Sequence, residues 1–447
     1  MTHDIIIIGA GPGGYIAAER AGAQEKKVLL IEKSALGGVC LNEGCIPTKT
    51  LLNSAKLYAH GMHAAQFGVS FDNPRFDLTA AMAHKKTVMD KLRAGIAYLM
   101  KKYAVEVVTG SASFVDKNTV AVDGKDYSAP NIIIASGSEA FVPPIPGVKD
   151  NPRVMTNREI LSIAEMPKSL VVVGGGVIGV EFATFFSTFG VKVDIVEMLP
   201  EIVPFMDTEI APLLRKELKH VSFHLSAKVE NVSGGTVEFT KDGKKESITA
   251  DIILMAVGRR PNVAGLGLEK IGVDFDGKGI KVNEKMQTNV PGIYAIGDAT
   301  GKWLLAHTAS RMGEVAVNVI AGKNDRMRYN AVPWALYGMP EAAGCGMTED
   351  EAKKNNVPYM KSSMQLRVNG RFLAENGSAG GICKVIAHKE SGVILGVHML
   401  GGACSEMIFG VAAMIESEIR INELKEIIFP HPSVSEIIRD VAFEMKI

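Results

Sequence analysis

Apolar runs and glycine-rich turns alternate at the start of the chain. Residues 5–8 are consecutive isoleucines with no polar position among them, which is typical of a parallel strand buried on both faces. The run leads directly into the turn 9–14, which has the spacing Gly-x-Gly-x-x-Gly, and then into a helical pattern over residues 15–24. A second apolar run, residues 28–31, follows and ends at Glu32. This order predicts a strand, a tight turn, a helix and a second strand.

The turn in this unit is a candidate phosphate-binding site. Gly9 and Gly11 allow a tight turn and the close approach of a pyrophosphate, whereas Gly14 allows the helix to pack closely on the strand. Glu32 is the acid expected to bind a ribose hydroxyl. The glycine pattern alone is weak evidence. With a strand before it, a helix after it and an acid at the right distance, it indicates a dinucleotide site.

The same unit recurs in the middle of the chain. The apolar run 170–173 leads into a second Gly-x-Gly-x-x-Gly turn, a helix to about residue 189 and another strand. The glycines and the acid of this second unit are Gly174, Gly176, Gly179 and Glu197. The interval from the first glycine to the acid is the same in both units, which two ligand-free turns would not require. Two dinucleotide sites predict a protein that passes electrons between two nucleotide cofactors.

Cys40 and Cys45 lie directly after the first unit, in a glycine-rich stretch. An undistorted helix would hold their Cα atoms roughly 8–9 Å apart, from its rise and radius. A disulfide needs less than about 7 Å, so Gly44 is the residue expected to bend the backbone and close the pair. A zinc site more often has Cys-x₂-Cys spacing and two further ligands, and none is clustered here. Inert thiols are the other alternative to a redox dithiol.

Length and charge narrow the class of protein. A chain of 447 residues predicts three or four domains. Lys and Arg number 49, as do Asp and Glu, so no net charge favours nucleic acid. No apolar run reaches the roughly 18 residues of a membrane span, and the first strand begins too early for a signal peptide. A cytoplasmic location is expected. Cys345, Cys383 and Cys404 have no motif around them and are expected to be buried or inert.

Later segments extend the pattern. Residues 132–138 predict a strand that returns to the first domain, and residues 293–298 another apolar strand that ends in Gly-Asp. A helix is expected to begin near Ala306. From residue 329 onward, alternating strands and two helices predict a separate α+β domain. The fold class expected for the whole chain is therefore α/β, with this α+β domain at its C-terminal end.

These motifs together identify a resemblance. The chain carries Cys40 and Cys45 followed by Pro-Thr-Lys, both glycine turns, the Gly-Asp pair that ends at Asp298, and the segment His-Pro-Ser-Val-Ser-Glu from His431 to Glu436, in that order. It resembles the flavin disulfide reductase family over nearly its whole length, and within that family the members that oxidise dihydrolipoamide.

The resemblance implies two Rossmann-like dinucleotide-binding domains and a C-terminal α+β dimerisation domain. The implied boundaries are residues 1–146 for an FAD-binding domain, 147–266 for an NAD-binding domain, 267–328 for a central domain that completes the FAD site, and 329–447 for the interface domain. The resemblance also implies a homodimer. Its implied substrate is a lipoyl-bearing protein of a 2-oxoacid dehydrogenase complex or of the glycine cleavage system. Neither nucleic acid nor a membrane is an implied partner.

The implied reaction is an electron relay. Dihydrolipoamide reduces the Cys40–Cys45 disulfide, electrons pass to FAD, and a hydride passes to NAD⁺. In the family pattern Cys40 is the interchange thiol, and Cys45 is the flavin-side thiol whose thiolate makes the charge-transfer contact. A thiolate requires a base, and the resemblance gives this role to His431, oriented by Glu436 and reaching across from the partner subunit.

The resemblance also implies the residues that bind the cofactors. Those for FAD are Gly9, Gly11, Gly14, Glu32, Lys49, Ala112, Gly137, Glu181, Asp298 and Ala306. Lys49 and Glu181 resemble an ion pair that lies beside the isoalloxazine, and Asp298 resembles the residue that contacts the ribityl chain. The helix that begins near Ala306 would direct the positive end of its dipole at the pyrimidine edge of the flavin. Those for NAD are Gly174, Gly176, Gly179, Glu197, Val229 and Gly258. A carboxylate at Glu197 binds ribose hydroxyls and repels a 2′-phosphate, which favours NAD over NADP; no metal is implied.

Rival functions remain open. A glutathione-reductase-like enzyme would favour NADP, against Glu197, and a mercuric-reductase-like enzyme would need a cysteine pair near the C-terminus, where none follows Cys404. A pyridine nucleotide transhydrogenase lacks the redox dithiol. A flavoprotein redox sensor without turnover would bind the flavin, but dihydrolipoamide would not reduce it.

Overall fold

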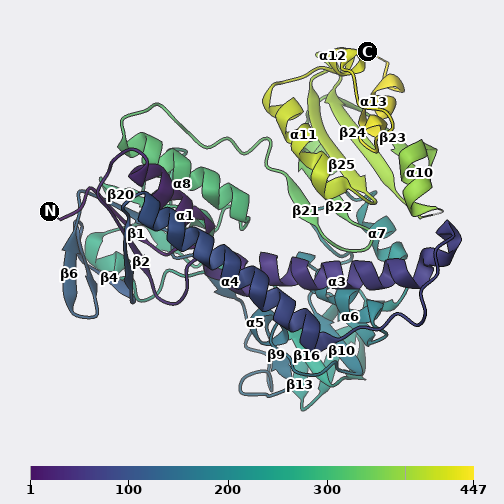
Figure 1. Cartoon of the computed structure of the whole chain (residues 1–447), viewed down its shortest axis with the longest axis horizontal. Helices are drawn as coiled ribbons and strands as arrows, with labels where there is room; N and C mark the ends of the chain where they lie inside the picture. Colours follow the sequence, from purple (N-terminus) through teal and green to yellow (C-terminus); the bar gives the residue numbers. More distant parts are fainter. Residues whose placement is uncertain (1, 378, 447) are drawn as a thin grey trace.

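The computed structural model describes residues 2–377 and 379–446, and three five-stranded sheets organise it (Figure 1). The first sheet has the order β20-β7-β1-β2-β3, with all neighbouring pairs parallel. Its strands are β1 (Ile5–Ile8), β2 (Val28–Glu32), β3 (Glu106–Thr109), β7 (Asn131–Ile134) and β20 (Ile293–Ala295). The isoleucines of β1 are buried on both faces, which explains why this strand has no polar position.

The second sheet repeats the arrangement of the first. Its order is β12-β11-β10-β16-β9, again with parallel pairs. Its strands are β9 (Val154–Met155), β10 (Ser169–Val173), β11 (Lys192–Val196), β12 (Val221–His224) and β16 (Ile252–Met255). In both sheets the strand before the glycine turn is central, so the turn opens at the carboxyl edge, where ligands bind in such folds.

In each half of the chain, a small three-stranded antiparallel sheet is inserted before the strand that returns to the parallel sheet. In the first half this is β4 (Ala112–Asp116), β5 (Thr119–Val122) and β6 (Lys125–Ser128), and in the second half β13 (Ala227–Ser233), β14 (Thr236–Lys241) and β15 (Lys244–Thr249). The chain passes between the halves twice, and β8 (Ser138–Ala140) pairs there with β17 (Arg259–Pro261). The two halves are therefore structural repeats joined by a short ribbon.

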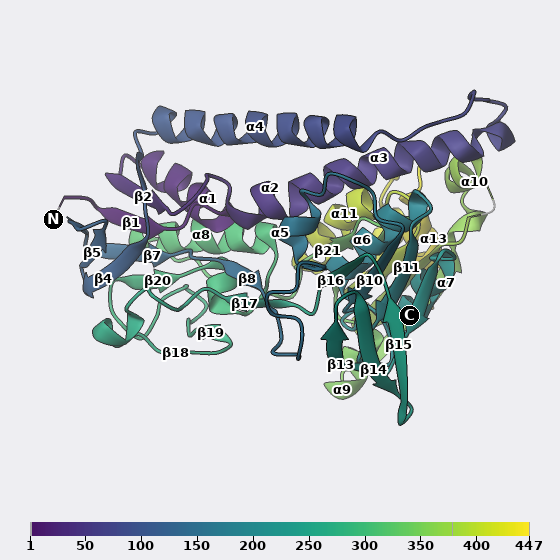
Figure 2. The same ribbon diagram turned by 90° about the horizontal axis from the view of Figure 1, so that it is seen from below.

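Two long helices run along one side of both halves. They are α3 (Cys45–His63) and α4 (Leu78–Lys102), which lie side by side (Figure 2). α3 starts at the first half and continues between the second half and the C-terminal part of the chain (Figure 1). Because Cys45 is the first residue of α3, the dithiol lies where these parts meet.

The third sheet, β21-β22-β25-β24-β23, is antiparallel. Its strands are β21 (Trp334–Leu336), β22 (Ala342–Gly346), β23 (Tyr359–Gln365), β24 (Ile382–His388) and β25 (Ile394–Leu400). The helices among them in the described residues are α9 (Glu349–Lys354), α10 (Gly370–Asn376), α11 (Cys404–Glu416), α12 (Ile421–Glu426) and α13 (Glu436–Phe443). The α/β class with an α+β C-terminal domain is confirmed, but the expectation of two helices here is wrong, because three short helices join the two longer ones.

No helix within residues 2–377 and 379–446 is long and apolar enough to cross a membrane.

Candidate active site

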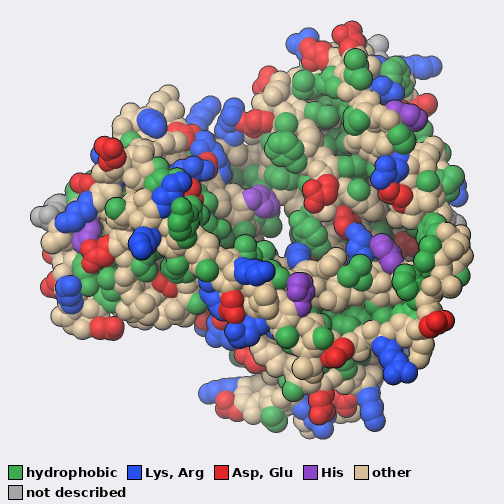
Figure 3. Space-filling view, viewed as in Figure 1, with side chains coloured by type: hydrophobic (Ala, Val, Ile, Leu, Met, Phe, Trp, Pro, Cys, Tyr) green, Lys and Arg blue, Asp and Glu red, His purple; other side chains and the backbone are tan. Residues whose placement is uncertain are grey.

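One large cavity connects the two glycine turns. Its volume is about 2310 Å³, and its walls come from both dinucleotide-type halves, the cysteine segment and the C-terminal domain. The space-filling view shows the surface deeply hollowed where these parts meet (Figure 3). All the site residues predicted from the sequence line this cavity except Gly14, Gly179, His431 and Glu436.

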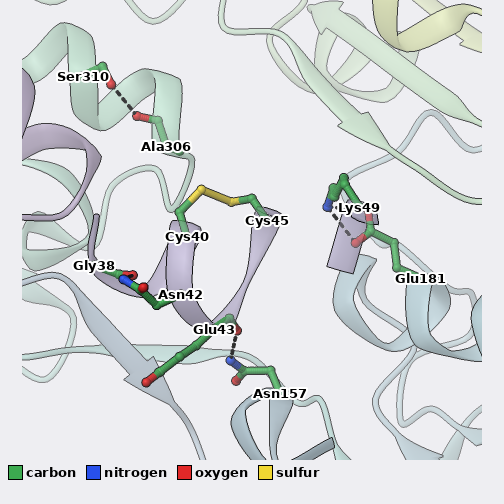
Figure 4. Close-up of a disulfide and its surroundings, with 10 residues drawn as sticks. All are labelled: Gly38, Cys40, Asn42, Glu43, Cys45, Lys49, Asn157, Glu181, Ala306 and Ser310. Atoms are coloured by element: carbon green, nitrogen blue, oxygen red, sulfur yellow. Dashed lines mark hydrogen bonds and ion pairs between the residues drawn. A yellow bond between two sulfur atoms is a disulfide. The ribbon is translucent and has the colours of Figure 1, made fainter. Parts of the chain in front are cut away.

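The two cysteines form a disulfide at the wall of this cavity (Figure 4). Their Cα atoms are 4.7 Å apart. Cys40 lies in α2 (Gly38–Glu43), Cys45 starts α3, and Gly44 between them has φ −146° and ψ −107°, far from helical values. A Cβ on Gly44 would lie only 3.2 Å from the Val39 carbonyl oxygen. The bend predicted at Gly44 therefore brings the two thiols together.

The second half of the chain holds the helix that carries Cys40. The Asn157 side-chain amide donates to the Glu43 carbonyl oxygen over 2.6 Å (Figure 4). The Arg158 guanidinium pairs with the Glu43 carboxylate over 2.8 Å. Asn157 and Arg158 begin α5 (Asn157–Ile160), which belongs to the second half. The disulfide is thus fixed relative to both halves.

A second, smaller cavity lies beside Cys40. Its volume is about 240 Å³, and Cys40 lines it but Cys45 does not. Its remaining walls are mostly apolar, with Leu41, Ile46, Leu92 and Ile96 among them. Of these two cavities, Cys40 therefore lines both, whereas Cys45 lines the large one alone.

The glycine turns fit the pyrophosphates of two dinucleotides. Gly11 and Gly176 line the cavity, and a Cβ on either would meet no atom closer than 4.0 Å. They precede α1 (Pro12–Gly22) and α6 (Val177–Thr188), and neither helix has a side-chain cap at its N-terminus. Free amides at a helix N-terminus bind anions favourably. The backbone can therefore approach a phosphate closely at both turns.

Gly14 and Gly179 have a packing role in the structure. A Cβ on Gly14 would lie 1.8 Å from the Gly9 carbonyl oxygen, and a Cβ on Gly179 would lie 2.2 Å from the Gly174 carbonyl oxygen. These distances are far below van der Waals contact, so only glycine lets the helix lie so close to the turn. Both residues consequently lie behind the cavity wall.

The two acids occupy equivalent positions. The Glu32 carboxylate accepts a hydrogen bond from the Ala10 amide over 2.7 Å, and the Glu197 carboxylate accepts one from the Gly175 amide over 2.6 Å. Each acid is therefore held against its own glycine turn. A second amide, from Ser34 or from Leu199, binds the other carboxylate oxygen in each case. Carboxylates fixed beside a phosphate-binding turn are suited to accept ribose hydroxyls.

Lys49 and Glu181 form an ion pair in the wall of the large cavity. The Lys49 ammonium is 2.9 and 2.8 Å from the two Glu181 carboxylate oxygens (Figure 4). Glu181 is almost fully buried in α6, and it also accepts a hydrogen bond from the Tyr337 amide over 3.1 Å. The Lys49 ammonium also lies over the Tyr337 ring, 4.8 Å from its centre. The pair thus joins α3, α6 and the C-terminal domain at one wall of the cavity.

Asp298 belongs to a polar cluster whose other members, Ser138 and Arg259, no sequence motif indicates. The Ser138 hydroxyl donates to Asp298 over 2.5 Å and accepts a hydrogen bond from the Arg259 guanidinium over 2.8 Å. All three residues line the large cavity. Burial raises the pKa of Asp298 above its ordinary value, although Ser138 and Arg259 favour its ionised form. Ser138 and Arg259 lie at the two crossings between the halves, and only the pairing of β8 with β17 shows that they meet.

His431 and Glu436 interact, but they lie apart from the disulfide within one chain. His431 Nδ1 is 3.1 Å from a Glu436 carboxylate oxygen, and the Ser433 amide donates to the same carboxylate over 2.9 Å. The Ser433 amide and His431 hold the pKa of Glu436 below its ordinary value. The His431 side chain is 82 % exposed and lines neither cavity.

The other three cysteines are free and buried. Burial raises the pKa of the Cys345 thiol to about 12 and raises those of Cys383 and Cys404 as well. These thiols remain protonated at neutral pH and are poor nucleophiles, as the sequence predicts.

Two dinucleotide-type halves with a disulfide in the cavity between them define an oxidoreductase of the disulfide-exchanging class. The chain belongs to the pyridine nucleotide-disulphide oxidoreductase family, whose model matches residues 3–313. The dimerisation domain of the same family matches residues 332–442. The chain therefore forms a homodimer through its C-terminal domain, and its cofactors are FAD and NAD(H).

Curated relatives match the chain over nearly its whole length. A dihydrolipoyl dehydrogenase of Bacillus subtilis is 38 % identical, over 99 % of this chain and 96 % of its own. The mitochondrial dihydrolipoyl dehydrogenase of Pisum sativum is 39 % identical, over 98 % and 91 %.

Solved structures share the fold at lower identity. LpdA from Mycobacterium tuberculosis has a TM-score of 0.90 at 27 % identity, covering 99 % of each chain. The HOCl-induced flavoprotein disulfide reductase RclA from Escherichia coli has a TM-score of 0.88 at 28 % identity, covering 99 % of this chain and 100 % of its own.

Proposed function

We propose that this protein is a dihydrolipoyl dehydrogenase, which oxidises dihydrolipoamide on a lipoyl-bearing protein and reduces NAD⁺ to NADH. The observation that carries the proposal is the Cys40–Cys45 disulfide in the wall of a cavity that reaches both glycine turns. The whole-length similarity to dihydrolipoyl dehydrogenases supports the choice of substrate.

The two cavities suit different roles for the two cysteines. Cys40 is open to the small apolar cavity, where the hydrocarbon part of a lipoyl group fits, so Cys40 is the thiol that exchanges with substrate. In this step dihydrolipoamide gives up two electrons and two protons and closes its own disulfide, while the Cys40–Cys45 bond is reduced to two thiols. Cys45, which lines the large cavity and not the small one, is the thiol on the flavin side.

The chain holds the cofactors through residues of both repeats. FAD would lie along the first turn with Glu32 at its ribose, Asp298 at its ribityl chain, and Lys49 with Glu181 beside its ring system. When bound, FAD accepts the electron pair of the dithiol and passes a hydride to NAD⁺. The NAD site is the second turn, where the groove walls include Val229 and Gly258.

The base for the dithiol step is His431, supplied by the partner subunit. Glu436 orients its ring and stays ionised at neutral pH, because its pKa is held below the ordinary value. The homodimer and the exposure of His431 at the surface of the dimerisation domain support this arrangement.

We expect Glu197→Arg to shift the ratio of NADH to NADPH formation by at least about 10-fold towards NADPH, equivalent to about 1.4 kcal/mol. The substitution removes a carboxylate that is fixed at the ribose position and places a cation where a 2′-phosphate would lie. Steady-state rates with NAD⁺ and NADP⁺ measure the ratio. Glu230→Arg is the matched control, because Glu230 is exposed on the neighbouring strand β13 and does not line the cavity. An unchanged ratio in the Glu197 variant would show that this acid does not select the nucleotide.

The decisive test is NAD⁺ reduction by dihydrolipoamide with the purified, flavin-containing protein, with NADP⁺ assayed in parallel. Rapid formation of NADH with little NADPH supports the substrate, the dithiol and the role of Glu197 together. If the flavin is bound but dihydrolipoamide does not reduce it, the substrate is another disulfide or the protein is a redox sensor.

We further propose that the protein acts in the cytoplasm, on a 2-oxoacid dehydrogenase complex or the lipoyl carrier of glycine cleavage. Three free cysteines are consistent with a reducing compartment. Co-purification of the tagged protein with lipoylated proteins from the cytoplasmic fraction tests this, and recovery in another compartment would contradict it.

A further inference from the structure

The loop after the second acid folds back onto the second glycine turn. This loop, residues 197–207, connects β11 to the segment before α7 (Ala211–Glu217) and will be called the acid loop. The Val203 amide donates to the Gly175 carbonyl oxygen over 2.9 Å, and the Gly175 amide donates to Glu197 over 2.6 Å. Several of its side chains, including those of Glu197 and Phe205, line the large cavity. The acid loop and the glycine turn therefore form one side of the nucleotide groove.

The acid loop is held in a strained conformation. Val203 has φ +46°, in the left-handed region, and its side chain is fully buried. A β-branched residue rarely adopts this conformation, because its Cβ approaches the backbone too closely. Such strain persists only where surrounding contacts enforce the conformation. Contacts outside the loop must therefore hold it.

Arg215 of α7 holds Glu201 of the loop from within the same half, over 2.8 Å. A second set of contacts comes from the dimerisation domain. The Lys384 ammonium of β24 lies 3.0 Å from the carboxylate of Asp207, the last residue of the acid loop, and 2.7 Å from the carboxylate of Glu349. The Glu349 amide also donates to Asp207 over 3.3 Å. Lys384 is fully buried, and Asp207 is 1 % exposed. The end of the loop is thus tied to the other domain by buried charges.

These charges remain paired at neutral pH. Burial alone would raise the pKa of Asp207, but hydrogen bonds from Lys384 and the Glu209 amide outweigh it and hold that pKa below the ordinary value. Hydrogen bonds to Glu349 and Asp207 likewise outweigh burial and raise the pKa of Lys384. Removing one member would leave a buried charge without its partner, which is strongly unfavourable.

A second contact fixes the same loop nearby. The Phe205 ring packs edge-on against the Trp334 ring of β21, with 5.2 Å between the ring centres. Trp334 belongs to the dimerisation domain, so both contacts join the acid loop to the same body. The dimerisation domain, which contributes neither glycine turn, therefore helps to fix the position of the loop.

We propose that Lys384 is a positioning residue for the pyridine nucleotide: through Asp207 it holds the acid loop, and with it Glu197, against the second glycine turn. This inference rests on the proposed binding of NAD at that turn. It assigns a buried lysine of the dimerisation domain a part in the affinity for NAD(H), whereas the disulfide and its reaction with dihydrolipoamide should not depend on it.

The test compares Lys384→Met with the control Lys353→Met. Lys353 contacts the same Glu349 carboxylate over 2.9 Å but does not contact Asp207, and its side chain is 57 % exposed. Hydrogen exchange of the Val203 amide, measured without nucleotide, reports the loop directly. NADH titration reports affinity, and rapid reduction of the flavin by dihydrolipoamide reports the thiol half-reaction. In Lys384→Met we expect exchange at Val203 and the Kd for NADH each to rise about 10-fold, with flavin reduction unchanged; Lys353→Met should match the unaltered protein.

Asp207→Asn serves as a second variant, because it keeps the shape of the side chain and leaves Lys384 paired with Glu349. It should change Val203 exchange and NADH affinity in the same direction, by a smaller factor. The inference is overturned if both variants bind NADH as the unaltered protein does, or if flavin reduction and NADH binding fall together, which would indicate general damage. If the unaltered protein binds no NADH, the proposed function and the inference both fail.

Discussion

NADH formation from dihydrolipoamide should fall by roughly 10³-fold or more when Cys45 is replaced by serine, the scale on which loss of a nucleophile acts. Without the Cys40–Cys45 bond the substrate dithiol has no disulfide to reduce, and its electrons have no route to the large cavity. Cys40→Ser should have an equally large effect, because Cys40 is the sulfur open to the small cavity.

The two cysteine variants should differ in their remaining thiol. In Cys40→Ser the thiol of Cys45 is left at the first turn of α3, where the helix N-terminus stabilises a thiolate. In Cys45→Ser the thiol of Cys40 is left beside the small cavity. Bound FAD would nevertheless cover Cys45, whereas Cys40 stays open to the small cavity. Alkylation of the flavin-containing protein by a thiol reagent at neutral pH, followed by mass spectrometry, should therefore be faster in Cys45→Ser.

Cys345→Ala is the matched control for both variants, since Cys345 is buried in β22 and bonded to no other cysteine. It should retain the activity of the unaltered protein with dihydrolipoamide. Dye reduction by NADH, which bypasses the disulfide, should persist in all three variants. Activity of Cys45→Ser near that of the unaltered protein would show that the disulfide is not the electron acceptor for the substrate.

The sequence predicts those parts of the site whose residues lie close together along the chain. Each dinucleotide unit is a continuous segment, so the strand, the turn, the helix and the acid can be read together, and Glu32 and Glu197 indeed lie against their own turns. The bend at Gly44 is equally local, because the two cysteines are close in sequence. Short-range patterning therefore suffices for the repeats and for the disulfide.

Contacts between distant segments need either a family resemblance or the structure. The pairing of Lys49 with Glu181 follows from the resemblance alone, since no local pattern connects α3 to α6. Ser138, Arg259 and Asp298 come from three segments, and only the crossing of β8 and β17 brings them together. A serine or an arginine beside a strand has no periodicity that reveals such a partner.

The sequence around Lys384 indicates that this lysine has a buried partner but not which residue the partner is. It interrupts the apolar strand β24, where an unpaired lysine would be very unfavourable, so the sequence indicates that a buried acid must exist. The identity of that acid depends on how the second half docks on the C-terminal domain. The short helices α9, α10 and α12 escaped prediction because segments of six or seven residues are too short to establish a helical period.

The second large effect is expected at His431. His431→Gln should lower NADH formation from dihydrolipoamide by about 10²–10⁴-fold, the usual contribution of a general base. Glutamine keeps a polar side chain of similar length but cannot take the proton of the substrate thiol. Glu436→Gln should have a smaller effect in the same direction, because it removes the partner 3.1 Å from His431 Nδ1 rather than the base itself.

Rapid-mixing kinetics separate these effects. Flavin reduction by dihydrolipoamide should slow in His431→Gln, whereas flavin reduction by NADH should not. We expect the nucleotide to reach the flavin through the large cavity, which His431 does not line. His388→Gln is the control, since His388 lies at the end of β24 and lines neither cavity. Equal slowing of both half-reactions would contradict a role for His431 in the thiol step.

Hybrid dimers test which subunit supplies the base. When Cys45→Ser chains and His431→Gln chains are refolded together, a hybrid dimer pairs the intact disulfide of one chain with the intact His431 of the other. If the base crosses the interface, that site is active, and random pairing returns about a quarter of the activity of the unaltered dimer. If the base acted within its own chain, every site would lack one group and no activity would return. The exposure of His431 on the dimerisation domain, away from both cavities, favours the first outcome.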